Sequence, residues 1–361
     1  MAERTVTLTG CHRLTSLAEG ETIITVLYRV ASAVPHRPAL LTRGFGRSRT
    51  KQISYAQLLE HVERVAEVLT LCGVRRGETI ALQVPNCWGS AALMLACFRI
   101  GAVVVPVHPG VDEDGLERVL AGTGACACVV FDTYLGQRNA ERLLTVSERL
   151  PALRHRIVLG DAAATGALDF DQLYRDRAGL WLPEGERLGP PPRDTDGPCL
   201  SVPAIGPTSV TLTHYRHWDL CADAFLSMHA LADVLAGRDK RPLQPPGEVF
   251  GTSYPITEPS GLMPLLWQPL LTGGTGVSTD RWAPDECLDL FGEAGVTMML
   301  CPAEHWEQLL EEQRLRPRPL PHLHTAALHT TAVPPELAAG VEEAFGVPLR
   351  PMPFQQAAGD R

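Results

Sequence analysis

Lysine is nearly absent from this sequence. Of the 32 basic residues in the 361-residue chain, only Lys51 and Lys240 are lysines, and the other thirty are arginines. A reaction that requires a lysine amine therefore has two candidates. The net charge of −9 argues against a general nucleic-acid binder, because neutralising phosphates requires clustered Lys and Arg. We expect no nucleic-acid partner.

Paired metal-binding cysteines, a secretory signal and a membrane-spanning run are missing as well. The ten cysteines include no C-x-x-C pair, so we interpret them as reduced core thiols. Cys126 and Cys128 would share one face of a strand, where metal binding is the alternative to burial. The N-terminal segment lacks a basic stretch followed by an apolar run, and the most apolar helix is broken by Gly101 and Pro106. We predict a cytoplasmic protein with no membrane partner and no metal site.

Helical and strand patterns alternate along the first half of the chain. Ser54 and Gln57 form a capping box before a helix that extends to Gly73. Short apolar runs suited to buried strands follow, separated by helical segments. This alternation predicts right-handed crossovers and a parallel sheet with helices on both faces. The expected strands are 79–85, 102–107 and 125–132, and the expected helices after the first are 88–100 and 111–124.

The composition changes between about residues 179 and 198, where Pro, Gly and charged residues indicate an exposed connector. A second alternating stretch follows it. We therefore predict the fold class α/β: two α/β subdomains, over 1–190 and 198–361, with mainly parallel sheets flanked by helices. The expected elements of the second are strands at 248–256 and 295–302, helices at 261–274 and 334–346, and a strand end and long helix within 210–235.

Several motifs occur in a characteristic order. A G-V-x-x-G turn begins at Gly73, P-N follows at Pro85 and Asn86, and G-A-V-x-x-P begins at Gly101. By these motifs the chain resembles the acyl-CoA synthetases and related adenylate-forming enzymes, over about residues 22–349. The resemblance implies the family's large N-terminal domain and its reaction, in which Mg-ATP adenylates a carboxylate and the acyl group passes to a thiol. Because the sequence ends before the family's small C-terminal domain, we expect that domain to be absent.

The sequence departs from this family at the phosphate-binding loop, which reads S-G-T-T-G-x-P-K-G-V in the family. The glycines of such a loop let backbone N–H groups approach phosphate oxygens. Here V-P-A-I at 202–205 replaces G-T-T-G, Thr208 stands at the lysine and Ser209 at the next glycine, while Ser201 and Pro207 agree. Proline supplies no backbone donor and isoleucine blocks close approach. We predict a degenerate loop that does not hold a triphosphate.

Other ATP-contacting motifs are altered at the same time. H-T-T-A at 329–332 replaces the family's G-G-A-P turn, which supports adenine. P-F-Q-Q-A at 353–357 replaces Y-G-M-T-E, whose glutamate helps to hold magnesium. P-I-T-E-P-S-G replaces P-L-x-H-x-x-G and puts Glu258 at the histidine that lies near the substrate. The scaffold motifs are kept while these are lost, so we expect no cofactor, and no use of ATP, Mg or CoA.

Three residues are candidates for catalysis. Glu258 is either a surface carboxylate or a cation ligand or base. His214 either caps and packs a helix or contacts a ligand. His329 belongs with His322 and His324 to a run that is either a polar sheet end or a metal or acid/base cluster, since His322 and His324 would share one face of a strand. The substrate-pocket candidates implied by the resemblance are Thr257, Glu258, Gly261, His329 and Thr330.

These observations predict an acyl-CoA-synthetase-like pseudoenzyme, a non-adenylating binding or partner subunit of a biosynthetic pathway. Two alternatives stay open: an enzyme with an ATP-independent reaction on a carboxylate or activated acyl intermediate, and an acid–thiol ligase with an atypical nucleotide loop. We expect a carboxylate or acyl-type small molecule as ligand. We expect an active paralogue or a second copy as partner, because losing the family's further units would expose apolar surface. The Arg, Ala and Pro content suggests an actinobacterial source.

Overall fold

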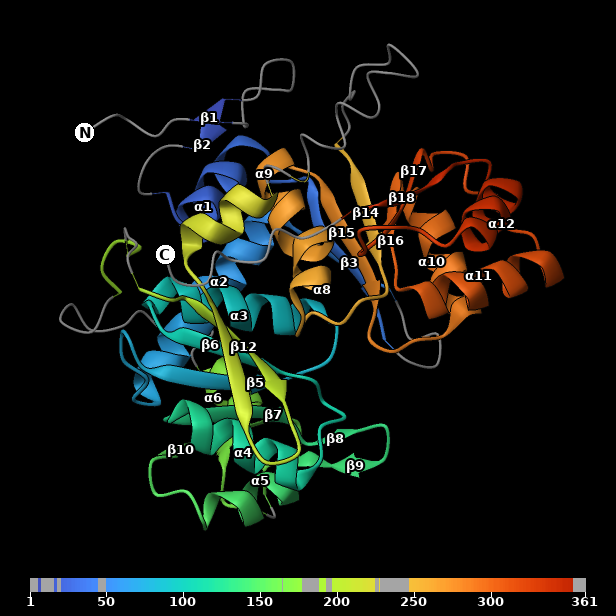
Figure 1. Ribbon diagram of the computed structural model, residues 1–361. Helices are drawn as coiled ribbons and strands as arrows, with labels where there is room; N and C mark the ends of the chain where they lie inside the picture. Colours follow the sequence, from blue (N-terminus) through green and yellow to red (C-terminus); the bar gives the residue numbers. More distant parts are fainter. Residues whose placement is uncertain are drawn as a thin grey trace. The chain divides into compact units, whose positions relative to one another are not determined.

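Two seven-stranded sheets, each in its own compact unit, organise the chain in the computed structural model (Figure 1). Unit 1 comprises 1–58, 86–88 and 218–361, and unit 2 comprises 59–85 and 89–217. Both sheets are mostly parallel and flanked by helices, which confirms the predicted fold class. The structure describes residues 6–7, 16–17, 21–44, 50–163, 165–176, 188–192, 197–224, 227 and 247–352.

The sheet of unit 2 has the order β11-β10-β7-β5-β6-β12-β13, and only the β12–β13 pair is antiparallel among its described strands. Right-handed crossovers account for this order, because β5, β6 and β7 alternate with helices along the chain. Its strands are β5 (Thr79–Gln83), β6 (Val103–Val107), β7 (Ala127–Phe131), β10 (His155–Leu159), β11 (Leu168–Asp169), β12 (Leu200–Ile205) and β13 (Val210–Tyr215). The helices of this part of the chain are α2 (Tyr55–Leu71), α3 (Trp88–Ile100), α4 (Glu113–Thr123), α5 (Asn139–Ser147) and α6 (Phe170–Asp176), beside a small pair β8 (Thr133–Tyr134) and β9 (Gln137–Arg138).

The sheet of unit 1 has the order β18-β17-β16-β14-β15-β3-β4, parallel except for β3 and β4. Its strands are β3 (Pro38–Arg43), β4 (Lys51–Ser54), β14 (Val249–Thr252), β15 (Thr275–Thr279), β16 (Met298–Leu300), β17 (Thr325–Leu328) and β18 (Leu349–Pro351). Its helices are α1 (Ile23–Ala33), α8 (Pro259–Leu262), η1 (Met263–Trp267), α9 (Gln268–Thr272), α10 (Pro284–Ala294), α11 (Ala303–Leu315) and α12 (Pro335–Phe345). A short antiparallel pair, β1 (Val6–Thr7) and β2 (Ser16–Leu17), precedes them.

The core of unit 1 lies between its sheet and helices α10, α11 and α12, which pack together in Figure 1. Trp306 is fully buried there, and its indole N–H donates to the Ala327 carbonyl at 3.0 Å. Trp267 is buried in η1, so both tryptophans are core residues, while Trp282 is half-buried. In the part of the chain that the structure describes, no helix is long and apolar enough to cross a membrane.

Local signals in the sequence placed most elements correctly. Ser54 Oγ accepts from the Gln57 N–H and Gln57 Oε1 accepts from the Ser54 N–H, which confirms the capping box at α2. Gly73 adopts a positive φ of 91° just past that helix. The 261–274 helix contains a π-helical segment, η1, that the sequence analysis did not predict. Pro264 and Pro269 lack the N–H that a regular helix needs, which accounts for the irregularity.

The two units differ from the predicted division at 190–198. Residues 1–58 belong to unit 1 together with the second half of the chain, and there β3 runs parallel to β15. Along the chain, the predicted connector comes before β12 and β13, the last two strands of the unit 2 sheet. Pairing between strands as far apart in the chain as β3 and β15 leaves no local signal in the sequence, whereas a change of composition can be read locally. Most of the predicted connector, much of the helix within 210–235, and the 353–357 segment lie outside the described residues.

Candidate functional site

Polar side chains gather where the strand order of unit 1 reverses. The chain passes from β14 to β15 on one side and then returns to β16 on the other side of β14. In open α/β sheets, ligands bind at the carboxyl ends of strands at such a reversal. Ser253 and Tyr254 directly follow β14, Cys301 directly follows β16, and His329 directly follows β17. This edge is therefore the candidate site.

Tyr254 links the polar residues of this edge. Burial raises the pKa of its hydroxyl to about 12, a hydrogen bond from the His329 backbone lowers it, and the Cys301, Glu258 and Glu304 side chains raise it. The Tyr254 and His329 rings meet edge to face, with centroids 6.5 Å apart. We call these residues, together with Ser253 and His305 described below, the Tyr254 cluster. At neutral pH the tyrosine is a protonated hydrogen-bond donor.

Asn86 holds the backbone of the cluster in place. It is the asparagine of the P-N motif and is buried. Its Nδ2 donates to the Tyr254 carbonyl at 2.9 Å, and its Oδ1 accepts from the Ile256 N–H at 2.6 Å. A single side chain thus satisfies two buried backbone groups on either side of Pro255. The P-N motif contributed to the family resemblance. The motif alone could not reveal that Asn86 contacts a segment about 170 positions later in the chain.

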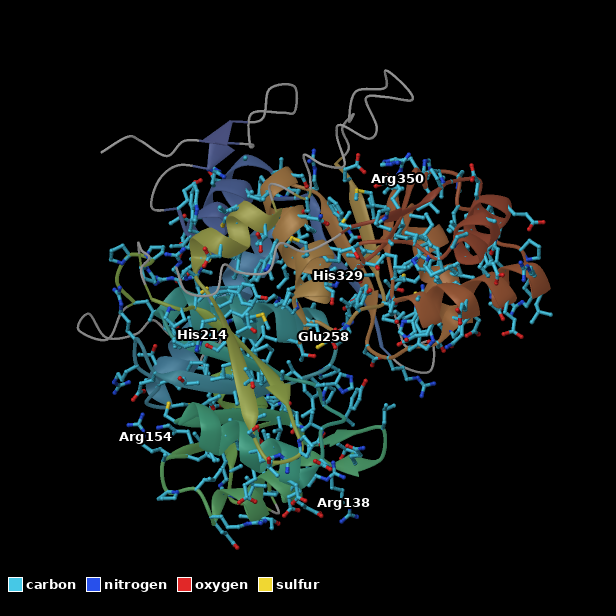
Figure 2. All side chains as sticks on the ribbon, viewed as in Figure 1. Arg138, Arg154, His214, Glu258, His329 and Arg350 are labelled. Carbon is cyan, nitrogen blue, oxygen red and sulfur yellow. The ribbon has the colours of Figure 1, made fainter. Side chains whose placement is uncertain are left out.

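Glu258, labelled in Figure 2, is the N-cap residue of helix α8. Its side chain makes no capping hydrogen bond. The Ser260 hydroxyl donates to its carboxylate at 3.3 Å. Glu258 is exposed as a whole, but burial of part of its side chain raises the pKa of its carboxyl. The Ser260 hydroxyl lowers this pKa and the Glu304 carboxylate raises it. Thr257 beside it is buried, and its hydroxyl has no hydrogen-bond partner among the described residues. This part of the site therefore combines a carboxyl group of raised pKa with a hydroxyl that has no hydrogen-bond partner among the described residues.

Gly261 and Thr330 are structural rather than reactive. A Cβ on Gly261 would lie 2.1 Å from the Pro255 carbonyl oxygen, so only glycine lets the helix approach that backbone. Thr330 Oγ1 donates to the Ala332 carbonyl at 3.0 Å and closes a local turn after β17. His329 is exposed, and burial of part of its ring lowers its pKa. Of the predicted pocket residues, Glu258, Thr257 and His329 thus present polar groups at this edge.

A serine and a histidine that the sequence analysis did not single out lie next to one another here. Ser253 Oγ is 2.8 Å from His305 Nδ1. The His305 ring stacks on Trp282 with centroids 3.6 Å apart and planes 2° apart, and the Trp282 indole N–H donates to Gln308 at 2.7 Å. Burial lowers the pKa of His305 to about 4, so the imidazole is neutral at neutral pH. The two partners are 52 positions apart in the sequence, so no local signal predicts their contact.

The segment aligned with the phosphate loop is a β-hairpin of unit 2. All six residues of β12 pair with β13, and the Gly206 N–H donates to the Ser209 carbonyl at 2.8 Å. Pro207 and Thr208 form the turn between them, and both are exposed, like Ser209. Proline favours the first central position of such a turn. The backbone of 202–205 is therefore engaged in strand pairing instead of forming an open loop.

His214 lies on β13 (Figure 2), where the family would use this position to begin a helix. Its Nδ1 is 2.8 Å from Ser201 Oγ on the neighbouring strand, so the predicted capping role is wrong. His217 is the packed histidine instead: it is buried with its ring edge to face against Phe98 at 5.3 Å. Ser201 is buried, whereas His214 is exposed.

Of the two alternatives for His322, His324 and His329, the cluster does not form. His322 and His324 precede β17 and His329 follows it, so the first two do not share a strand and lie at the opposite end of that strand from the third. His324 Nε2 pairs with Glu248 at 3.0 Å, a partner that sequence spacing did not reveal. Among the residues that the structure describes, no three His, Cys, Asp or Glu side chains gather as a metal site would require.

The comparisons with known proteins agree with this fold. Residues 27–201 match the family described as AMP-binding enzyme. The chain is 27% identical over 350 residues to 2-hydroxy-7-methoxy-5-methyl-1-naphthoate–CoA ligase of Streptomyces carzinostaticus, a match that covers 94% of this chain and 59% of that protein. It is also 27% identical over 358 residues to the salicyl-AMP ligase / salicyl-S-ArCP synthetase of Mycobacterium tuberculosis, covering 93% and 58%.

Solved structures show the same fold. Apo MbtA of Mycobacterium smegmatis matches with a TM-score of 0.75 at 22% identity, over 91% of this chain and 56% of that chain. The chain thus spans 56–59% of the length of these three proteins. Residues 27–201 are an AMP-binding domain, and over nearly its whole length the chain is similar to adenylate-forming acyl-CoA and aryl-CoA ligases.

Proposed function

We propose that this chain binds an activated carboxylic acid, an ester, thioester or acyl-adenylate, at the Tyr254 cluster without producing it from ATP. The observation that carries the proposal is the hairpin at 200–215. Phosphate cradles require several backbone N–H groups free to converge on one anion. In this chain the aligned backbone is paired between strands, and Pro203 and Pro207 have no N–H to offer.

The charges at the Tyr254 cluster favour an activated acid over a free one. Glu258 and Glu304 are both carboxylates, and the Glu304 charge raises the pKa of Glu258, so a bound anion would meet like charge in a partly buried site at a cost. An ester or thioester carries no charge on its acyl group and avoids this cost. The buried Thr257 hydroxyl, unsatisfied among the described residues, would gain a partner from a ligand carbonyl.

The relatives suggest an aromatic acyl group. The two curated relatives are named for a naphthoate and for salicyl, both aryl acids. Tyr254 and His329 present rings at the carboxyl edge of the unit 1 sheet, against which an aryl group can stack. As part of the same proposal, the protein serves as a non-adenylating binding or partner subunit beside an active paralogue or a second copy, and uses no Mg or CoA.

The test is ATP–pyrophosphate exchange with a panel of hydroxy- and amino-benzoic acids and naphthoic acids. We expect no exchange above the protein-free rate, with a salicyl-AMP ligase as the active control. Exchange with any acid at the rate of the control would overturn the proposal.

A variant of Glu258 tests the ligand class separately. Removing one carboxylate in Glu258→Gln should tighten binding of free benzoates at pH 7 by roughly 3- to 10-fold, about 1 kcal/mol of relieved repulsion. Binding of the matching benzoate ester should change less than about twofold, since an ester carries no charge for Glu258 to repel. Calorimetry with both ligands measures the difference, and an equal change for both would contradict the electrostatic argument.

A further inference from the structure

We propose that Ser253 and His305 are a nucleophile and general base that cleave activated carboxylic esters or thioesters. The proposal rests on the proposed function for its substrate class, an activated aryl acid. It adds a reaction that the adenylate-forming resemblance does not supply, and it rests on residues for which that resemblance provides no role.

The geometry is that of an activated nucleophile. A catalytic serine requires a base within about 2.6–3.2 Å and a third group that orients the base. Ser253 Oγ and His305 Nδ1 are 2.8 Å apart. The stacked Trp282 ring fixes the plane of the imidazole, and the bond from its indole to Gln308 fixes Trp282 in turn.

The buried Cys301 thiol completes the arrangement. It lies in hydrogen-bond contact with the side chain and the backbone of Ser253, and burial raises its pKa to about 11, so it keeps its proton at neutral pH. The Ser253 side chain and backbone both lower the pKa of the thiol, as groups that donate to its sulfur do, so the Ser253 hydroxyl lies between Cys301 and His305 Nδ1. The neutral imidazole can accept the serine proton. We assign Cys301 as a positioning residue that holds Ser253 at this edge.

The position in the fold agrees with this assignment. Ser253 is the first residue after the central strand β14 and precedes Tyr254, the residue that links the cluster. It is half-buried, whereas the other described serine–histidine pair, Ser201 and His214, has a buried serine. The Tyr254 backbone N–H already donates to Thr252 Oγ1 at 3.1 Å, so it does not serve the acyl oxygen. We therefore assign the protonated Tyr254 hydroxyl as the donor to the acyl oxygen.

The reaction balances with water as the only co-reactant. Ser253 Oγ attacks the acyl carbon while its proton passes to His305 Nδ1, and an acyl–serine ester forms. The bond to the leaving group breaks, and the leaving alkoxide or thiolate takes the proton from His305. Water then attacks the ester, gives a proton to His305 and releases the free acid. That proton returns to Ser253.

The experiment is labelling of the full chain with an alkyl fluorophosphonate, followed by peptide mass spectrometry and by hydrolysis of p-nitrophenyl benzoate. We expect one adduct, on Ser253. Ser253→Ala should lose the adduct, and both Ser253→Ala and His305→Gln should lower hydrolysis by roughly 100-fold or more, the usual contribution of such a pair. Ser147→Ala, which removes a serine hydroxyl in α5 of unit 2, should leave labelling and hydrolysis unchanged.

Each outcome separates this inference from the proposed function. No adduct, an adduct on another residue, or full hydrolysis by a folded Ser253→Ala variant overturns the catalytic pair, with folding checked by circular dichroism. Calorimetric binding of a benzoyl-sulfamoyl adenosine mimic tests the ligand class independently. Binding without an adduct leaves the proposed function standing, and an adduct without binding upholds the pair but refutes the ligand class.

Discussion

Removing the Asn86 side chain should destabilise unit 1 by several kilocalories per mole. Asn86→Ala leaves the Tyr254 carbonyl and the Ile256 N–H without the bonds of 2.9 and 2.6 Å that they now make. Both residues are buried, at 9% and 0% exposure, so water cannot replace the amide freely. Each unsatisfied buried group costs about 1–3 kcal/mol, and the two together predict a loss of about 2–6 kcal/mol in the free energy of unfolding.

Urea unfolding followed by tryptophan fluorescence measures this loss in the unit concerned. Five of the six tryptophans, all except Trp181, fall in unit 1. A Trp181→Phe background therefore makes the signal specific to unit 1. A fall in the urea midpoint at an unchanged slope would mean lost stability of this unit.

Asn86→Asp is the matched control. An aspartate still accepts from the Ile256 N–H but cannot donate to the Tyr254 carbonyl unless it is protonated. We expect a loss of stability at pH 7 that lessens as the pH falls and the new carboxyl takes up a proton. An Asn86→Ala protein within about 0.5 kcal/mol of the parent, well below the cost of one unsatisfied group, would refute the reasoning.

Two further predictions concern stability. Burial lowers the pKa of His217 to about 4, so as the pH falls from 6.5 the unfolded chain takes up the proton before the folded chain does. The free energy of unfolding should therefore fall by up to about 3 kcal/mol by pH 4. His217→Phe should reduce that fall, as measured by urea unfolding at several pH values. Gly261→Ala places a methyl 2.1 Å from the Pro255 oxygen and should lower the free energy of unfolding by at least about 1–3 kcal/mol. The control is Gly122→Ala in helix α4, where the new methyl would lie 3.7 Å from Val210 and should raise the free energy of unfolding by about 0.5–1 kcal/mol. Equal melting temperatures for the two variants would contradict this prediction.

Local signals were sufficient for the elements and the fold class. The helix at 88–100 was predicted with its exact bounds, because the chain turns before it at Pro85 and after it at Gly101. The prolines and glycines that bound the other helices act over four or five residues, a range that sequence spacing reveals directly. The motif order then supplied the family, since it fixed the sequence of these elements.

The site could not be predicted in the same way. Ser253 and His305 meet only because β16 pairs beside β14, and strand order is a property of the whole sheet. The histidines at 322, 324 and 329 are close in sequence, but β17 separates them. The resemblance directed attention to Glu258, which proves to be one member of the cluster rather than a base with an oriented partner.

The measurement that tests the account most directly is calorimetric titration of the full chain with Mg-ATP and, separately, with a benzoyl-sulfamoyl adenosine mimic. Both ligands carry adenosine, but only ATP requires a phosphate cradle. We expect saturable binding of the mimic and no binding of Mg-ATP. Tight binding of Mg-ATP would mean that the hairpin at 200–215 opens to hold phosphates, and would contradict the loss of adenylation at the centre of the proposal.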